Sequence, residues 1–439
     1  MTLRRAVAFG ALVALLLPAA ASAHVTLVSS EPVTQSRVDV PPTEVRLTFN
    51  GPVTIAPNAV RVLAPDGTLV SGPARTDDGG HVVVAPVSGI VDGKGYTVRW
   101  RVIGSDGHSP AGVFTFGVGI AAPAPTDAVG ASGTTWRDDL ARWGVFGALA
   151  LLIGPLVVRL VVIRGAVPPR LERWFHVVGV VSAFLVIDIG IAAFVLRASN
   201  ALQVPIADLP YADLQPFAEK TRFGLAFLVM TLGFGVVAAL LLVGWVLDRL
   251  ELRWPALVLA LALVSGLSLS GHQATEPNAA PLAELADWLH LVTASIWVGG
   301  VATLAFLVWP LGPSVRREAF LRFARLAVVL VAVLVLAGAY LALVRLPALS
   351  DLWTTEYGRF LLLKSALAAF ALSFGAVHHL VIRPRLERGD EPDVGPSLAG
   401  EATVAFAVLL AAAILTNLAP PPIDAGPSTT APTPARTTR

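Results

Sequence analysis

The sequence predicts an all-β, immunoglobulin-like sandwich followed by an all-α membrane bundle. Three observations support this fold class. Residues 24–119 alternate apolar and polar side chains with a period of two, which is typical of strands. Residues 143–418 instead carry eight long apolar runs. Charged residues make up only 14% of the 439 positions, whereas soluble domains carry about 25%. We therefore expect a multi-pass membrane protein with a water-soluble domain ahead of its bundle.

A secretory signal peptide is predicted at residues 1–23. Two arginines precede a short apolar run, and small residues stand at Ala21 and Ala23, where signal peptidase requires them. Cleavage after Ala23 would make His24 the first residue of the mature chain. A terminal histidine offers both an α-amine and an imidazole to one metal ion, and the α-amine has a reference pKa of about 7.7–8.0. The alternative is that a histidine follows the cut by chance.

The segment 24–119 is predicted to be an extracellular antiparallel β-sandwich. Its apolar residues recur at every second position, and turns rich in proline, glycine and aspartate separate the runs. Short strands at this spacing are typical of an immunoglobulin-like sandwich. The clearest alternating runs are Val45–Phe49, Tyr96–Val102 and Phe114–Val118.

A loop between the last two runs, residues 105–110, carries Asp106 and His108. A carboxylate and an imidazole two residues apart, across a glycine, can converge on one ion; an Asp-Gly turn with a solvated histidine is the alternative. With His24 they would supply an amine, two imidazoles and a carboxylate, a donor set that suits tetragonal Cu(II). The chain has no cysteine, and Met230 is its only methionine beyond Met1, so a sulfur-rich cuprous site is excluded.

The bundle, residues 143–418, is predicted to cross the membrane eight times. Arginines cluster in the loops after the first, third, fifth and seventh runs, which places these loops in the cytoplasm. The N-terminal domain and the C-terminal tail then both lie outside the cell. A flexible linker is expected at 120–142 and a disordered tail at 419–439. The apolar runs lie near 143–163, 174–196, 222–247, 254–271, 288–310, 323–345, 359–382 and 401–418.

Five histidines stand at the ends of predicted spans. His272 and His290 are expected at the outer face of the membrane. His176, His378 and His379 are expected at the inner face. Because polar groups in lipid are costly and often functional, these side chains are candidate steps of a metal path. The alternative is that they are interfacial residues that meet water or lipid headgroups.

Two charged residues fall inside the predicted spans. Asp188 lies mid-span, where a carboxylate must be protonated, paired or turned towards a cavity. Lys364 lies near the outer side of the seventh span, from which its ammonium can snorkel to water. We assign neither side chain a role beyond packing or pairing.

Several motifs of the N-terminal segment occur together in one known family. They are His24-Val25 at the mature start, Ser29–Pro32, Val45–Phe49 and the stretch from Ser105 to Phe116. In these motifs the segment resembles CopC, the periplasmic copper-resistance protein. The resemblance implies that the terminal histidine and the Asp-Gly-His loop bind Cu(II), which gives His24, Asp106 and His108. Asn50 departs from the pattern, since some members have an acidic residue just after the same strand.

A second set of motifs occurs in the bundle, densest over residues 320–385. They are Phe320–Ala327, Gly338–Tyr340 and Thr355–Lys364, with Leu289-His290 and Trp297–Gly300 upstream. In these motifs the bundle resembles CopD, the inner-membrane copper-resistance protein. The resemblance implies copper handling across the membrane. Fusions of a CopC-like domain to a CopD-like bundle are a known arrangement, and this chain fits one from end to end.

We therefore expect a plasma-membrane protein that captures Cu(II) outside the cell and hands copper to its bundle for import, homeostasis or resistance. Two alternatives stay open: a haem- or copper-containing redox protein, with His176–His379 and His272–His290 as haem-holding pairs, and an outer-surface copper buffer without transport. We do not expect an enzyme. The net charge of +2 gives no reason to expect binding to nucleic acid. The expected partners are copper and the lipid bilayer, and any metal-exchange or homo-oligomer partner is left unidentified.

Overall fold

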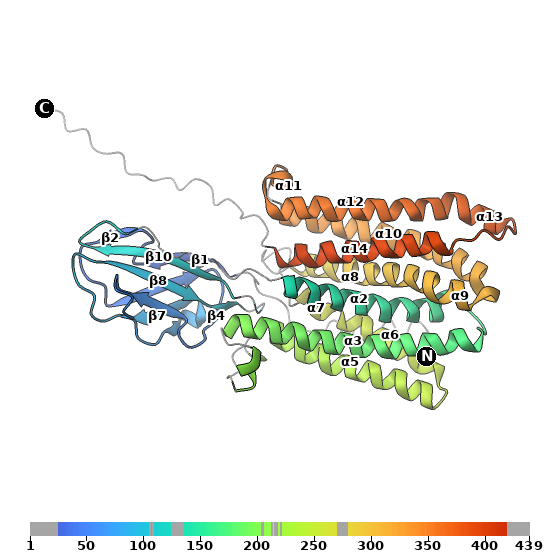
Figure 1. Cartoon of the computed structure of the whole chain (residues 1–439), viewed down its shortest axis with the longest axis horizontal. Coiled ribbons are helices and arrows are strands. Elements are labelled where there is room, and N and C mark those ends of the chain that lie inside the picture. Colours follow the sequence, from blue (N-terminus) through green and yellow to red (C-terminus); the bar gives the residue numbers. More distant parts are fainter. Residues whose placement is uncertain are drawn as a thin grey trace.

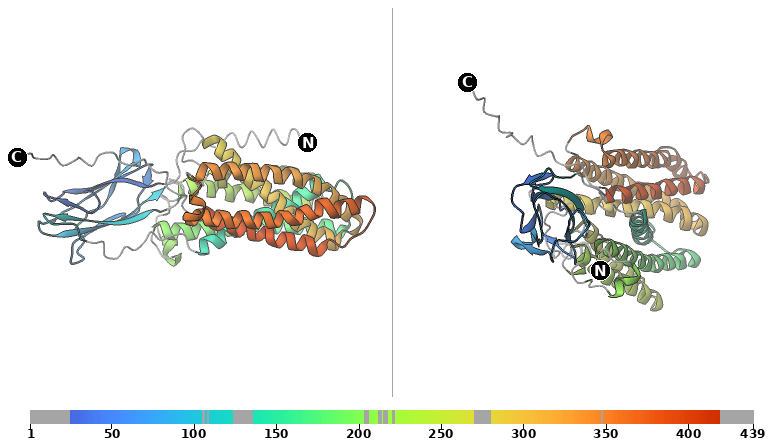
Figure 2. Two further views of the ribbon diagram at one scale, coloured as in Figure 1. Left: turned by 90° about the horizontal axis from the view of Figure 1, so that it is seen from above. Right: turned by 60° about the vertical axis from the view of Figure 1, so that its left-hand side comes forward.

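The computed structural model describes residues 25–104, 107, 109–123, 136–202, 206–211, 214, 218–219, 222–269, 280–346 and 348–418. A domain of strands and a bundle of long helices follow one another along the longest axis of the molecule (Figure 1). The same end-to-end arrangement is seen after a quarter turn about that axis (Figure 2). The predicted fold class, a β-sandwich followed by a helical membrane bundle, is confirmed.

The β-domain consists of two four-stranded sheets and a two-stranded ladder. The sheet orders are β1-β3-β7-β6 and β2-β10-β8-β5, and β4 pairs with β9. Alternate residues of β3, Val45, Leu47 and Phe49, are buried, so the period of two in the sequence marks the face that packs into the core. The strands are β1 Leu27–Glu31, β2 Ser36–Val38, β3 Glu44–Phe49, β4 Val53–Thr54, β5 Val60–Leu63, β6 Arg75–Asp77, β7 Val82–Pro86, β8 Gly95–Arg101, β9 Ile103–Gly104 and β10 Ala111–Val118.

The helical part contains eight helices, within the described residues, that are long and apolar enough to cross a membrane. This agrees with the eight predicted spans. They are Trp136–Val162, Pro169–Ser199, Gly224–Val246, Leu250–Leu267, Leu282–Leu311, Pro313–Arg345, Glu356–Glu387 and Gly395–Asn417. The α-helices are α2 Trp136–Val157, α3 Pro169–Leu202, α5 Arg222–Val246, α6 Arg253–Leu263, α7 Ser265–Leu269, α8 Ala280–Thr303, α9 Trp309–Leu311, α10 Arg316–Arg345, α11 Asp351–Thr354, α12 Glu356–Val377, α13 Arg383–Glu387 and α14 Gly395–Asn417.

The first span begins earlier than the apolar run that predicted it. Helix α2 starts at Trp136, so residues 136–142 of the expected linker are helical. Asp138 and Asp139 stand in the first turn, where a carboxylate is favoured by the partial positive charge of a helix N-terminus. A hydropathy criterion misses such a polar first turn, because the residues that start the helix are not the ones that enter the lipid.

The bundle has two apolar cores that share α2. One core joins α2 mainly to α3, α5 and α6, and the other joins α2 mainly to α8, α10 and α14. Helices α3 and α8 also contribute to both cores, through Leu171 and Phe175 of α3 and Val292 of α8. Helices α2 and α8 approach closely at Gly154 and Gly299, where a Cβ on either glycine would overlap the backbone of the other helix. Small residues at a membrane helix contact permit this approach, as expected for Gly299. Helix α12 lies at the periphery and packs on α14.

Candidate functional site

The predicted Cu(II) ligands His24, Asp106 and His108 lie outside the described residues, as does His272. Their ligation therefore stays a prediction. Near the three predicted Cu(II) ligands, Val25, Gly104, Gly107 and Ser109 are described, and they show where the chain approaches the predicted site.

The flanks of the predicted Cu(II) ligands lie at one end of the sandwich. The amide N–H of Thr26 donates to Asn50 Oδ1 (2.8 Å), and the amide of Asn50 donates back to the Thr26 carbonyl (3.1 Å). Just beyond Asn50, Val53 pairs with Gly104 in the β4–β9 ladder. The amide of Gly107 in turn donates to the Gly104 carbonyl (2.9 Å). Asn50 thus holds the first described residues of the sandwich against the end of β3.

That end of the sandwich contacts the bundle. Ile103 of β9 is only 1% exposed, although it sits on a two-residue strand, because it packs in a cluster with Phe194 and Ala198 of α3 and with Leu209. Figure 1 shows β4 close to the end of α3. The strand that leads into the predicted loop is therefore the part of the sandwich that touches the membrane domain.

His290 of α8 has both ring nitrogens engaged. Nδ1 lies 3.1 Å from the Leu334 carbonyl, and Nε2 lies 3.5 Å from Nζ of Lys364. A carbonyl only accepts and a lysine ammonium only donates, so Nδ1–H donates to Leu334 and the lone pair of Nε2 accepts from Lys364. The lone pair that a metal ion would use faces an ammonium instead.

A second polar group lies beside this pair. Arg345 at the end of α10 approaches Asp287 Oδ1 (3.8 Å) and donates to the Tyr357 hydroxyl (3.4 Å). Tyr357 and Lys364 both belong to the Thr355–Lys364 motif on which the CopD resemblance rests. Sequence reasoning expected Lys364 to snorkel to water and assigned nothing to Arg345 or Tyr357. The motif instead directs Tyr357 towards α10 and Lys364 towards α8. These two side chains lie on the same face of α12, about two helical turns apart.

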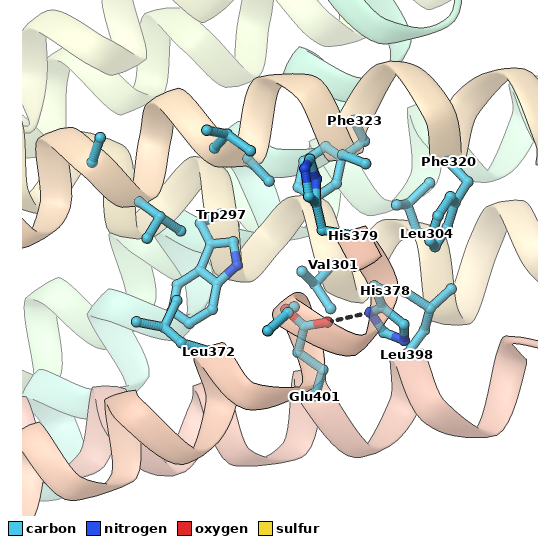
Figure 3. Close-up of a pocket in the computed structure, with 17 residues that line it drawn as sticks. Trp297, Val301, Leu304, Phe320, Phe323, Leu372, His378, His379, Leu398 and Glu401 are labelled. Carbon is cyan, nitrogen blue, oxygen red and sulfur yellow. Dashed lines mark hydrogen bonds and ion pairs between the residues drawn. The ribbon is translucent and has the colours of Figure 1, made fainter. Parts of the chain in front are cut away.

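A cavity of about 370 Å³ lies between α10 and α12, with residues of α8 and α14 lining it as well (Figure 3). His378 and Glu401 lie at its edge: His378 Nδ1 is 2.8 Å from Glu401 Oε2, and His378 Nε2 is 2.7 Å from Ser397 Oγ. Glu401 is 3% exposed. The sequence analysis singled out His378 and missed Glu401, whose signal was a lone carboxylate at the start of the last apolar run.

The other two histidines of this group have different surroundings. His379 lines the same cavity as His378, and its buried Nδ1 has no hydrogen-bond partner in the described part of the chain. His176 is buried on α3 and stacks on Trp245 of α5, with ring centroids 5.7 Å apart. The expected His176–His379 pair across a haem stays a prediction.

Asp188 is exposed on α3, and no hydrogen bond or ion pair joins it to another described residue. The sequence allows a carboxylate at this position to be paired, protonated or turned to a cavity. Among the described residues, the structure shows no partner that would pair with Asp188. More broadly, no group of three or more His, Cys, Asp or Glu side chains within the described ranges is arranged to hold a metal ion.

The buried His378–Glu401 pair gives a stability prediction. Glu401→Leu is expected to destabilise the bundle by about 3–5 kcal/mol, because it strips His378 of its buried partner, whereas Glu401→Gln keeps a hydrogen-bonding group there and should cost less. Thr403→Leu, on the exposed face of α14, is the control. Thermal unfolding of the detergent-solubilised chain would measure this; equal midpoints for the two leucine variants would contradict it.

Comparisons with known proteins match this architecture part by part. The family model described as CopC domain matches residues 27–119, which is the sandwich. The model for copper resistance protein D-like, N-terminal domain, matches residues 135–281, which covers α2 to α7. The model for copper resistance protein D matches residues 317–415, which covers α10 to α14. Sequence reasoning placed the CopD resemblance in this last segment and did not separate the earlier helices as a family of their own.

One relative spans nearly the whole chain. The copper transport protein CutJ of Bacillus subtilis (strain 168) is 27% identical over 429 residues, which covers 92% of this chain and 76% of that protein. Solved structures similar to the sandwich include CopC from Methylosinus trichosporium OB3b, 28% identical with a TM-score of 0.21, covering 24% of this chain and 98% of that one. PcoC, a methionine-rich copper resistance protein from Escherichia coli, is 25% identical with a TM-score of 0.19, covering 22% and 99%.

The family matches follow one another in the order of the domains. The CopC match ends at residue 119, and the two membrane matches cover residues 135–281 and 317–415 of the bundle. The chain therefore combines a CopC domain at its N-terminus with a CopD-like membrane domain.

Proposed function

We propose that this protein binds Cu(II) outside the cell through His24, Asp106 and His108 and passes copper to its membrane bundle for import. One observation carries the proposal: the described flanks of all three residues lie at the end of the sandwich whose strand β9 packs on α3. An ion held there would stand next to the membrane domain. We infer a non-enzymatic role.

The direction we propose is inward. The predicted signal peptide and the arginine-rich loops favour an extracellular sandwich, which would collect metal outside the cell. The inner-end residues His378 and Glu401 then form the polar end of the path, and a buried carboxylate is a favourable neighbour for a cation in a medium of low dielectric constant. His290 is the corresponding residue near the outer end.

Electron paramagnetic resonance tests the capture step. The full chain, loaded with one Cu(II), would be compared with a variant that carries one additional glycine between Ala23 and His24, after mass spectrometry has established each mature N-terminus. We expect a tetragonal, nitrogen-rich signal that changes with the extension, because the α-amine moves away from the imidazole. An unchanged signal, or no tight binding, would remove the terminal chelate from the site.

The contact between Lys364 and His290 gives a prediction for the membrane path. Lys364→Leu should strengthen copper-ion binding at His290 by about tenfold or more, since it frees the Nε2 lone pair and removes a like charge; two unit charges 4 Å apart interact by about 4 kcal/mol at an effective dielectric constant of 20. Competition of the purified full-length chain against a Cu(II) chelator would measure the affinity. The double variant Lys364→Leu/His290→Ala is the control and should lose the gain.

Cellular copper accumulation separates transport from buffering at the outer surface. His290→Ala should reduce accumulation while leaving the Cu(II) resonance signal of the sandwich unchanged. Unchanged copper accumulation in this variant would show that His290 is not part of a copper path through the bundle. Unchanged accumulation in a strain that lacks the protein altogether would leave the surface-buffer alternative.

A further inference from the structure

The cavity between α10 and α12 opens towards the lipid. Val328 of α10 lines it and is 52% exposed, and Ala376 of α12 lines it from an exposed position as well. Helices α10 and α12 are the least buried spans of the described bundle, with 17% and 6% of their apolar windows buried. A ligand can therefore enter from the hydrocarbon phase, and such a ligand must be soluble in the membrane.

The lining combines an apolar body with a polar end. Aromatic and aliphatic side chains form most of the wall, including Trp297, Phe320 and Phe323. The polar end is formed by His379 and by the His378–Glu401 pair, and in Figure 3 these side chains and Trp297 surround the same space. The buried Nδ1 of His379 still has no partner in the described part of the chain, and leaving a buried polar atom without one is unfavourable.

These features select one class of ligand. The volume of about 370 Å³ lies in the range of small-molecule sites, about 300–1,000 Å³, and is far larger than a single ion needs. An acyl chain would fill the apolar part and leave His379 unpaired. A flat ring that carries both carbonyl and hydroxyl groups, attached to an apolar tail, would satisfy both parts.

We propose that this cavity binds the ring of a membrane quinone or quinol. His379 Nδ1–H donates to a ring carbonyl, and the carboxylate of Glu401 accepts from a ring hydroxyl in the reduced form. The aromatic walls at Trp297 and Phe323 flank the ring, and the tail leaves past Val328 into the bilayer. The proposal concerns binding, and it does not depend on the Cu(II) site of the sandwich.

Fluorescence quenching of the full-length chain tests this site. The chain would be placed in nanodiscs of synthetic phosphatidylcholine without quinone and titrated with decylubiquinone. We expect saturable quenching that His379→Phe weakens by at least tenfold. Glu401→Gln should weaken binding of the reduced form, decylubiquinol, by at least tenfold and binding of decylubiquinone by less, because only the quinol has a hydroxyl to donate to the carboxylate. Ala327→Phe, which fills the cavity from α10, should abolish the quenching. Val329→Phe, on the 59%-exposed outer face of the same helix, is the matched control and should bind as the parent does.

The outcomes separate the candidates. Decylbenzene, which has the same tail without ring oxygens, should not compete; if it displaces decylubiquinone fully, the site is a lipid-tail groove and the proposal is overturned. Unsaturable quenching by the parent, or parent-like binding by both Ala327→Phe and His379→Phe, overturns it too. Melting curves identify any variant that fails to fold, and the Cu(II) resonance signal should be the same in all folded variants.

Discussion

Replacing His108 with alanine is expected to weaken Cu(II) binding by more than about 100-fold. Loss of an outer-sphere partner alone typically costs 10- to 100-fold in metal affinity, and a lost imidazole removes a bond to the ion itself. The chain has no cysteine to substitute for it. Competition with a Cu(II) chelator of known affinity, on the purified full-length chain, would measure the change.

His81 provides a matched control for that experiment. It lies on the same domain, after the short 3₁₀ turn Asp78–Gly80, and its Nδ1 lies 3.1 Å from the Asp78 carbonyl. The His81 carbonyl accepts from the Phe49 amide next to Asn50 (2.8 Å), so His81→Ala removes an imidazole from the same end of the sandwich while leaving the three predicted donors in place. We expect parental Cu(II) affinity. Equal losses for His81→Ala and His108→Ala would show that copper binds the domain non-specifically and would refute the assigned donor set.

Gly299→Ala is expected to be the most destabilising single-methyl change in the bundle. A Cβ at Gly299 would overlap the carbonyl of Ala150 and the Cα of Gly154, and backbone atoms cannot rotate away as a flexible side chain can. Helices α2 and α8 must then separate, and both lie at the centre of the bundle, with 72% of each apolar window buried. We expect a loss of about 3 kcal/mol or more, at the upper end of the costs of overpacking a core.

Gly190→Ala is the control for this substitution. Gly190 is also within a spanning helix, α3, but a Cβ there meets nothing within 4 Å. Alanine is the better helix former by about 0.8–1.0 kcal/mol, so Gly190→Ala should be neutral or slightly stabilising. Thermal unfolding of the two variants in the same detergent makes the comparison. Similar midpoints would mean that α2 and α8 do not rely on close approach at Gly299.

Periodicity was a sufficient guide to the architecture because each environment imposes its own repeat. Leu47 and its neighbours in β3 alternate since one side of the sheet packs and the other meets water, and the apolar runs are continuous since lipid surrounds them. The start of α2 at Trp136 was missed because capping and dipole effects in a polar first turn leave no trace in hydropathy.

The sites were harder to predict because partners come from distant helices. His290 and His378 stood out as polar residues at the ends of apolar runs. Nothing in the sequence connects His290 with Lys364, 74 positions away, or His378 with Glu401. These pairs depend on which faces of α8, α12 and α14 meet, and that is decided by tertiary packing such as the α2–α8 contact. The expectation that Lys364 reaches water took account of its own helix only, and not of the helices packed beside it.

In the proposed function, the burial of Ile103 against α3 would also determine how an ion leaves the sandwich. With a free domain, each dissociated ion would diffuse into bulk solution and compete with all other chelators there. A domain held against the bundle makes transfer an intramolecular event, for which effective concentrations reach the millimolar range. Delivery would then depend little on the concentration of free metal in the surroundings. The fraction of captured ions that reach the bundle would be set by the distance between the two domains.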